Sequence, residues 1–306
     1  MGITMIDNSL CDSGFVDGVR PSQIVTYINA LHEYGIAYNE ISTGTLELLP
    51  VGYDCKNIIL RVTDEAELPM ANTCRFGYVC LPERLWNYAG DIDSPVMLEL
   101  SPHGSNFLLY ALNAFSKGEL TNISALRIKD DFDMEAYQLS ATIEIYKNDA
   151  LLPLDICPTD GKLTAVSSLI SAAAAGADSV TMRFGSCGEY AELKDGAFAM
   201  AGMFSAPLPD DITKALIKCS LLYRMIYGRE AAGILSHTDG IYLPFNCNAE
   251  YPFHLNRRKY AEAANAEKRG NPSSLLRRLK SMSVDSDNAA DLEKALDEFC
   301  IKLFNK

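Results

Sequence analysis

Short apolar segments alternate with segments of helical periodicity over the first two thirds of this chain. Strands that alternate with helices pair in parallel, and eight such units close into a barrel. We therefore predict an α/β fold, a compact (β/α)8 TIM barrel. A doubly wound open sheet is the alternative, but no glycine-rich phosphate loop follows the first strand. The expected strands are residues 3–6, 36–41, 57–62, 75–81, 96–100, 125–129, 151–157 and 179–184.

The connections between these strands are short for a barrel of this kind. Helical patterns cover residues 22–31, 82–89, 106–115, 134–147, 163–175 and 189–203. We expect the connections after the third and fourth strands to be short or irregular, because little sequence separates those strands.

The pattern changes beyond about residue 206. A helix is expected to the residue before Gly228, then an irregular stretch over 231–253, then helices at 259–268, 273–280 and 287–303. We therefore predict two domains, a TIM-barrel domain at 1–206 and a C-terminal linker and helical subdomain at 207–306. The second domain would be a helical appendage on the barrel.

Charge and cysteine content exclude several classes of protein. The 306 residues carry a net charge of −13, which disfavours binding to a nucleic-acid backbone. None of the 9 cysteines lies in a C-x-x-C pair, so a structural zinc site is not expected. The odd count and the lack of a secretory leader indicate reduced thiols and a cytoplasmic protein. The longest small-apolar run, 165–177, is too short to span a membrane.

Polar clusters follow the first and seventh strands. Asp7 and Asp12 follow the first, where carboxylates could hold a cation or could simply cap a turn. Asp155 and Cys157 alternate in the seventh strand, so they share a face and could hold one metal. A loop with one buried cysteine is the alternative, and spacing alone favours it.

Two further clusters could carry chemistry. The glycine turn at 185–189 presents backbone N–H groups suited to an anion. The stretch from 236 to 242 brings together His237, Asp239 and Tyr242, which could move protons near neutral pH. A surface histidine beside a turn is the simpler interpretation of the second cluster.

Taken in order, these stretches resemble the homocitrate synthase/isopropylmalate synthase family of DRE-TIM metallolyases. Hydroxymethylglutaryl-CoA (HMG-CoA) lyase is a relative, and the likeness is closest to the nitrogenase-associated homocitrate synthases. Residues 7–14 follow that family's Asp-x-Thr-Leu-Arg-Asp/Glu-Gly, and 185–189 resemble its Asn-Gly-x-Gly-Glu turn. Residues 237–242 resemble its His-x-x-Gly-Ile-His, and 270–299 resemble its closing helical subdomain.

The resemblance implies a dimeric barrel enzyme that condenses acetyl-CoA with a small 2-oxo acid in a Claisen reaction. A divalent metal (Mg, Mn or Zn) would act on the 2-oxo acid as a Lewis acid. Carried over by position, the implied residues fall into three groups. They are the catalytic His237, Tyr242 and Glu189; the substrate-binding Cys11, Ser42, Asn106 and Asp130; and the metal ligands Asp12, Asp155 and Cys157.

The sequence departs from the family pattern at the positions that carry the family's catalytic and metal-binding residues. Cys11 stands where the family has the arginine that stabilises the oxyanion, and a thiol offers no guanidinium fork. No register around 155–160 supplies the two imidazoles of the metal-binding His-x-His. Asn106 lies near the place of an expected arginine.

Two interpretations of function follow. In the first, which we adopt, the chain is a divergent acyltransferase or aldolase-type enzyme with a rebuilt metal site, and the retained Asp12, Glu189, His237 and Tyr242 favour it. In the second, it is a non-catalytic homologue that acts as partner or regulatory subunit of an active synthase, and the loss of ligands favours it. The expected assembly is a homodimer, or a heterodimer with a synthase homologue.

Overall fold

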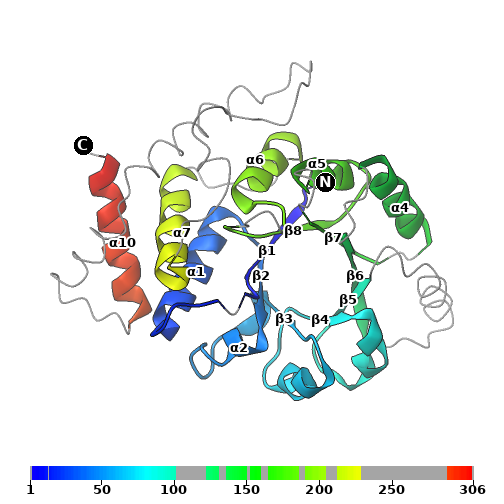
Figure 1. Cartoon of the computed structure of the whole chain (residues 1–306), viewed down its shortest axis with the longest axis horizontal. Helices are drawn as coiled ribbons and strands as arrows, with labels where there is room; N and C mark the ends of the chain where they lie inside the picture. Colours follow the sequence, from blue (N-terminus) through cyan, green and yellow to red (C-terminus); the bar gives the residue numbers. More distant parts are fainter. Residues whose placement is uncertain are drawn as a thin grey trace.

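Eight parallel strands close into a barrel in chain order, and the last strand pairs with the first (Figure 1). The computed structural model describes residues 2–12, 14–100, 122–130, 136–149, 152–159, 165–185, 190–204, 212–228 and 288–304. The predicted (β/α)8 barrel is therefore confirmed. The strands are β1 (Thr4–Leu10), β2 (Tyr38–Ser42), β3 (Ile58–Arg61), β4 (Tyr78–Pro82), β5 (Val96–Leu100), β6 (Ile123–Asp130), β7 (Leu154–Pro158) and β8 (Ser179–Met182).

Helices cover the outside of this barrel. The α-helices are α1 (Pro21–Tyr34), α2 (Thr43–Leu46), α4 (Ala136–Asp149), α5 (Ala165–Ala174), α6 (Leu193–Phe204), α7 (Ile212–Tyr227) and α10 (Ala289–Phe304). Short 3₁₀ helices are η1 (Cys55–Asn57), η2 (Glu65–Asn72) and η3 (Glu83–Asp91). Because η2 and η3 follow β3 and β4, the expected irregular connections are confirmed. The helices predicted at 106–115, 259–268 and 273–280 lie outside the described residues.

Strand β1 extends further than its apolar residues indicated. The sequence predicted a strand over 3–6 followed by a polar turn, but Asp7, Asn8 and Ser9 are buried within β1. The Asp7 carboxylate accepts hydrogen bonds from the Ser9 hydroxyl at 2.6 Å and from the Phe184 backbone N–H at 3.2 Å. These partners replace water, so the strand tolerates the buried carboxylate.

Two apolar layers hold the barrel. The larger lies between the strands and the helices and includes Ile24, Ile28 and Leu31 of α1, all fully buried. The smaller fills the barrel interior with Ile6, Ile59, Cys80, Met97 and Ala125. Fully burying an Ile or Met side chain contributes roughly 1.5–3 kcal/mol. Side chains thus pack the middle of the barrel, as is usual for this fold.

The last described helix lies beside α1 and α7 at one side of the barrel (Figure 1). Lys218 of α7 is buried, and its Nζ lies 2.7 Å from Glu33 Oε2 of α1 and 3.3 Å from Asp297 Oδ1 of α10. Leu292, Leu296 and Phe299 bury the apolar face of α10. The C-terminal helix predicted at 287–303 is thus present, and the 206/207 domain boundary stays a prediction. Among the described helices, none has the length and apolar character needed to cross a bilayer.

Candidate functional site

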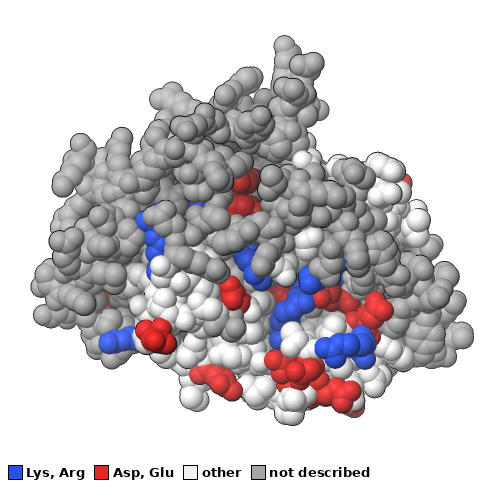
Figure 2. Space-filling view, viewed as in Figure 1, with Lys and Arg blue, Asp and Glu red and all other residues white. Residues whose placement is uncertain are grey.

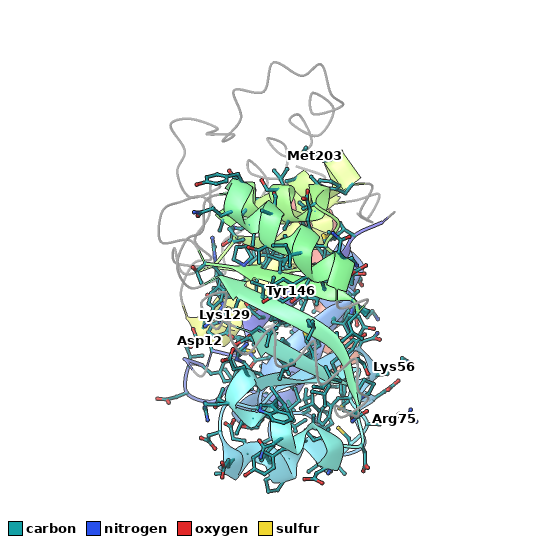
Figure 3. The ribbon with its side chains drawn as sticks, turned by 90° about the vertical axis from the view of Figure 1, so that its right-hand side faces the viewer. Asp12, Lys56, Arg75, Lys129, Tyr146 and Met203 are labelled. Carbon is teal, nitrogen blue, oxygen red and sulfur yellow. The ribbon has the colours of Figure 1, made fainter. Side chains whose placement is uncertain are left out.

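The two ends of the barrel carry different residues. Figure 3 places Asp12 and Lys129, which follow or end strands, on one side of the molecule, and Lys56 and Arg75, which precede strands, on the other. The side with Asp12 is the C-terminal end of the parallel strands, here called the mouth. Enzymes with this fold bind substrates at that end.

A layer of buried charge lies below the mouth and above the apolar interior. It consists of two guanidiniums and three carboxylates, so its formal charge is −1. We call these residues the charge layer: Glu40 of β2, Arg61 of β3, Glu99 of β5, Arg127 of β6 and Asp155 of β7.

Arg127 ties strands from opposite sides of the barrel together. It is fully buried, and its Nε donates to Asp155 Oδ2 at 2.6 Å while its Nη1 donates to Glu40 Oε2 at 2.6 Å. Its Nη2 donates to Thr181 Oγ1 at 3.0 Å. Asp155 also accepts hydrogen bonds from Ser179 at 2.8 Å and Thr181 at 2.7 Å. Burial of these ions is costly, and the hydrogen bonds offset that cost.

Arg61 is the member of the charge layer that reaches solvent. Its Nη1 donates to Glu40 Oε1 and to Glu99 Oε2, both at 2.9 Å, and its Nη2 donates to Glu99 Oε1 at 2.5 Å. A guanidinium has five N–H donors, so two remain beyond these three. The side chain is 20% exposed, whereas Arg127 is 0% exposed. Arg61 is therefore the member of the charge layer that a ligand at the mouth can reach.

The pKa values follow from this pairing. Burial opposes the charged form of Glu40, but the Arg127 and Arg61 guanidiniums outweigh it and hold the pKa of Glu40 below its usual value. Burial likewise opposes the charged form of Arg127, and Glu40 and Asp155 help to keep its pKa above the usual value. These shifts favour the charged forms of Glu40 and Arg127 at neutral pH.

Arg183 and Asn8 line the rim of the mouth. Arg183 Nε donates to Asn8 Oδ1 at 3.2 Å, and the Arg183 guanidinium carbon lies 4.1 Å from the centre of the Tyr190 ring. Asn8 Nδ2 lies 4.0 Å from the Cys157 sulfur. Figure 2 views this face and shows basic and acidic side chains next to each other among the described residues.

Three of the predicted site residues lie near the mouth. Cys11 follows β1, is half-buried, and has a raised pKa because of burial and the charge of Glu40. The Ser42 hydroxyl accepts from the Thr45 backbone N–H at 3.2 Å and so caps α2. Asp12 Oδ1 accepts from the Gly14 backbone N–H at 3.0 Å, which shapes the turn after β1.

The other two predicted metal ligands lie in β7. Asp155 and Cys157 are both buried and both face the barrel interior, as their alternation indicated. Asp155 already accepts three hydrogen bonds from side chains, one of them from a guanidinium. Among the described residues, no group of three His, Cys, Asp or Glu side chains could hold a metal ion. This part of the chain therefore does not fit the divalent metal that the resemblance implied.

The remaining predicted site residues lie outside the described side chains. His237, Tyr242, Glu189 and Asn106 fall in segments that the structure does not describe. Asp130 is the last residue of β6, and its side chain is likewise not described. Their roles stay predictions.

Sequence reasoning missed most of the charge layer. Only Asp155 was singled out, whereas Glu40, Arg61, Glu99 and Arg127 were not. A signal was present, because three of these four have apolar residues on both sides, in Leu60-Arg61-Val62, Leu98-Glu99-Leu100 and Leu126-Arg127-Ile128. A single charge in an otherwise apolar strand of a barrel indicates an inward-facing ion.

Comparisons with known proteins support the fold. No protein-family model and no curated protein matches the sequence. Among solved structures, an HMG-CoA lyase from Bacillus subtilis is 16% identical with a TM-score of 0.56, covering 76% of this chain and 96% of that chain. An HMG-CoA lyase from Acinetobacter baumannii, in complex with coenzyme A and 3-methylmalate, is 12% identical with a TM-score of 0.56, covering 79% and 96%.

A third structure has the same arrangement. The N-terminal domain of a putative aldolase from Bacteroides vulgatus is 11% identical with a TM-score of 0.54, covering 72% of this chain and 87% of that chain. What these proteins share with the chain is the barrel fold. At such identities the fold alone is shown, so function has to be argued from the site.

Proposed function

We propose that this chain binds a small carboxylate anion at the mouth and acts as a lyase- or aldolase-type enzyme on the carbon–carbon bond beside that group. The observation that carries this proposal is Arg61, which is 20% exposed and clamped by Glu40 and Glu99. A guanidinium pairs with a carboxylate through two parallel hydrogen bonds, and Arg61 keeps two donors beyond those already used.

The preorganisation of Arg61 favours catalysis as well as binding. Its clamped side chain needs little reordering when it binds the substrate carboxylate, so it can hold the reacting carbon in a fixed position. The buried Arg127 behind it holds Glu40 in place at 2.6 Å and so supports the position of Arg61.

The finer proposal is a Claisen reaction between acetyl-CoA and a 2-oxo acid. A base removes a proton from the acetyl methyl, and the resulting carbanion attacks the keto carbon of the 2-oxo acid. The keto oxygen then takes up a proton, and water cleaves the thioester to release CoA. We assign the proton transfers to His237, Tyr242 and Glu189 on the resemblance of their segments. Arg61 holds the carboxylate of the 2-oxo acid.

A bound divalent metal would supply Lewis-acid polarisation of the keto group in enzymes of this type. Asp12, Asp155 and Cys157 do not fit that role, because Asp155 already accepts three hydrogen bonds, one of them from the Arg127 guanidinium, and Asp12 accepts a hydrogen bond that shapes a turn. We therefore derive no step through a metal. The hydrogen-bond donors in this proposal come from the chain's own Arg61.

A second function is favoured by one observation, the thiol of Cys11 at the mouth. The resembling family has an arginine there, and a thiol cannot replace its charge or its bidentate geometry. The alternative is a non-catalytic homologue that pairs with an active synthase as partner or regulatory subunit.

A thiol-release assay separates the two proposals. The purified chain is incubated with acetyl-CoA and a panel of 2-oxo acids, and free CoA is measured with and without added divalent metal. CoA release that depends on the 2-oxo acid and is lost in Arg61→Met, but kept in Arg75→Met, supports the enzyme. Release only after mixing with an active synthase homologue supports the partner. No release in either arrangement overturns both.

A further inference from the structure

A cavity lies at the N-terminal end of the barrel, opposite the mouth. It has a volume of about 150 Å³ and is bounded by Thr4, Tyr38, Tyr78, Met97, Asp155 and Ser179, among others. Its rim includes the exposed Pro153, so it is open to solvent. Asp155 belongs to both the charge layer and the cavity wall. The charge layer therefore lies between this cavity and the mouth.

The cavity wall is apolar on one side. Ile6, Met97 and Ala125 form that side and are almost fully buried. The Tyr38 and Tyr78 rings meet edge to face with their centres 5.7 Å apart and an angle of 66° between them. Thioether and aromatic surfaces of this kind favour an aromatic ring.

The other side of the cavity is polar but close to neutral. Ser179 donates to Asp155 at 2.8 Å, and the charge of Asp155 is paired with Arg127 at 2.6 Å. Asp178 at the rim is paired with Lys147 at 2.6 Å. Neither lysine nor arginine lines the cavity among the described residues. Because both carboxylates are paired and no cation is present, an ionic ligand gains little there.

We propose that this cavity is a binding site for a small neutral phenol or aromatic alcohol of one ring. A protein cavity of about 150 Å³ accommodates benzene. In this chain the ring lies against Met97 and Ala125, and the hydroxyl exchanges a hydrogen bond with Ser179 Oγ. The site is formed in advance, because Ser179 and Asp155 are fixed by bonds to each other and to the charge layer.

Phenol and toluene are the probes that test this proposal, and the binding is followed by protein NMR shifts during titration. We expect the NMR shifts to reach saturation with phenol, and we expect toluene to bind with a higher dissociation constant. Ala125→Leu fills the cavity, so the phenol dissociation constant should rise at least about tenfold. Ser179→Ala leaves the volume and should remove the preference for phenol over toluene.

Two controls locate the binding. Phenol binding should persist in excess pyruvate, which separates this site from the mouth. If Ala125→Leu does not fold, Ser179→Ala still decides the matter. No saturable phenol binding, unchanged binding in Ala125→Leu, or an unchanged phenol-to-toluene ratio in Ser179→Ala overturns the proposal.

Discussion

The guanidinium of Arg61 binds the carboxylate of Glu99 through two hydrogen bonds, Nη1 to Oε2 at 2.9 Å and Nη2 to Oε1 at 2.5 Å. The two residues come from β3 and β5, so the pair crosses the interior of the barrel. This geometry fixes a partly exposed guanidinium at the mouth, and the proposed binding of a substrate carboxylate depends on it.

The charge layer is expected to be sensitive to the loss of one member. Arg127→Met leaves Glu40 and Asp155 buried with fewer partners, so the free energy of unfolding should fall by about 3–5 kcal/mol. Urea denaturation measures this. Lys56→Met removes an exposed ion pair with Asp54 and should leave the unfolding free energy unchanged within error. Equal effects of the two substitutions would contradict the proposed contribution of the charge layer to the free energy of unfolding.

Asp7 should make the stability depend on pH. Burial raises its pKa to about 6 from 3.8, although hydrogen bonds from Ser9 and Phe184 act in the opposite direction. The folded state thus holds a proton that the unfolded state releases, and this contribution is complete below pH 3.8 and lost as the pH rises through about 6. Its size is roughly 3 kcal/mol for a shift of this extent.

Asp7→Asn tests that expectation through denaturation at a series of pH values. The variant should show a flatter dependence of stability on pH between about 4 and 6 than the natural chain, since it has no proton to lose there. The titratable and charged groups that face Asp7 include Tyr27, Tyr227, Cys219 and Arg183, and the variant keeps all four. Asp93→Asn, at an exposed position, is the control and should keep the natural slope. A slope that Asp7→Asn does not change would refute the buried-carboxylate explanation.

Gly185 should tolerate no side chain. Its φ is +73°, and an added Cβ would lie 2.3 Å from Cζ of Tyr223 in α7. Gly185→Ala should therefore lower the unfolding free energy by about 2 kcal/mol or more, since strain and a clash combine. Gly52→Ala has a similar φ of +81° but nothing within 4 Å, so it should lose only about 1 kcal/mol. Thermal melts of both variants compare the two costs, and equal losses would rule out the clash with Tyr223.

The barrel could be predicted from the sequence because its strands have a distinct local signal. Apolar runs such as Val96–Leu100 are bounded by Pro and polar residues, and every predicted run overlaps a strand of the barrel. The irregular connections after β3 and β4, which are 3₁₀ helices in the structure, were predicted from the short spacing of those strands. Gly176, with a φ of +101°, follows α5 in the left-handed conformation that glycine favours at helix ends.

The site was less predictable, because its geometry depends on contacts between distant strands. Arg127 lies 87 residues from Glu40 and 28 from Asp155, and nothing local indicates that these side chains meet. Asp12 shows the opposite case, since its hydrogen bond to the Gly14 backbone is local. Among the described residues, Asp12 thus has a turn contact within its own segment, whereas Asp155 pairs with the Arg127 guanidinium 28 residues away.

Binding of a 2-oxo acid to the natural chain and to Arg61→Met tests the central claim most directly. Isothermal titration with pyruvate and 2-oxoglutarate gives the dissociation constants, and Arg75→Met at the other end of the barrel is the matched control. We predict saturable binding to the natural chain and to Arg75→Met, and a dissociation constant raised at least about tenfold in Arg61→Met, as expected for a lost charged hydrogen bond. Equal affinity in Arg61→Met and the natural chain would contradict a carboxylate site at Arg61.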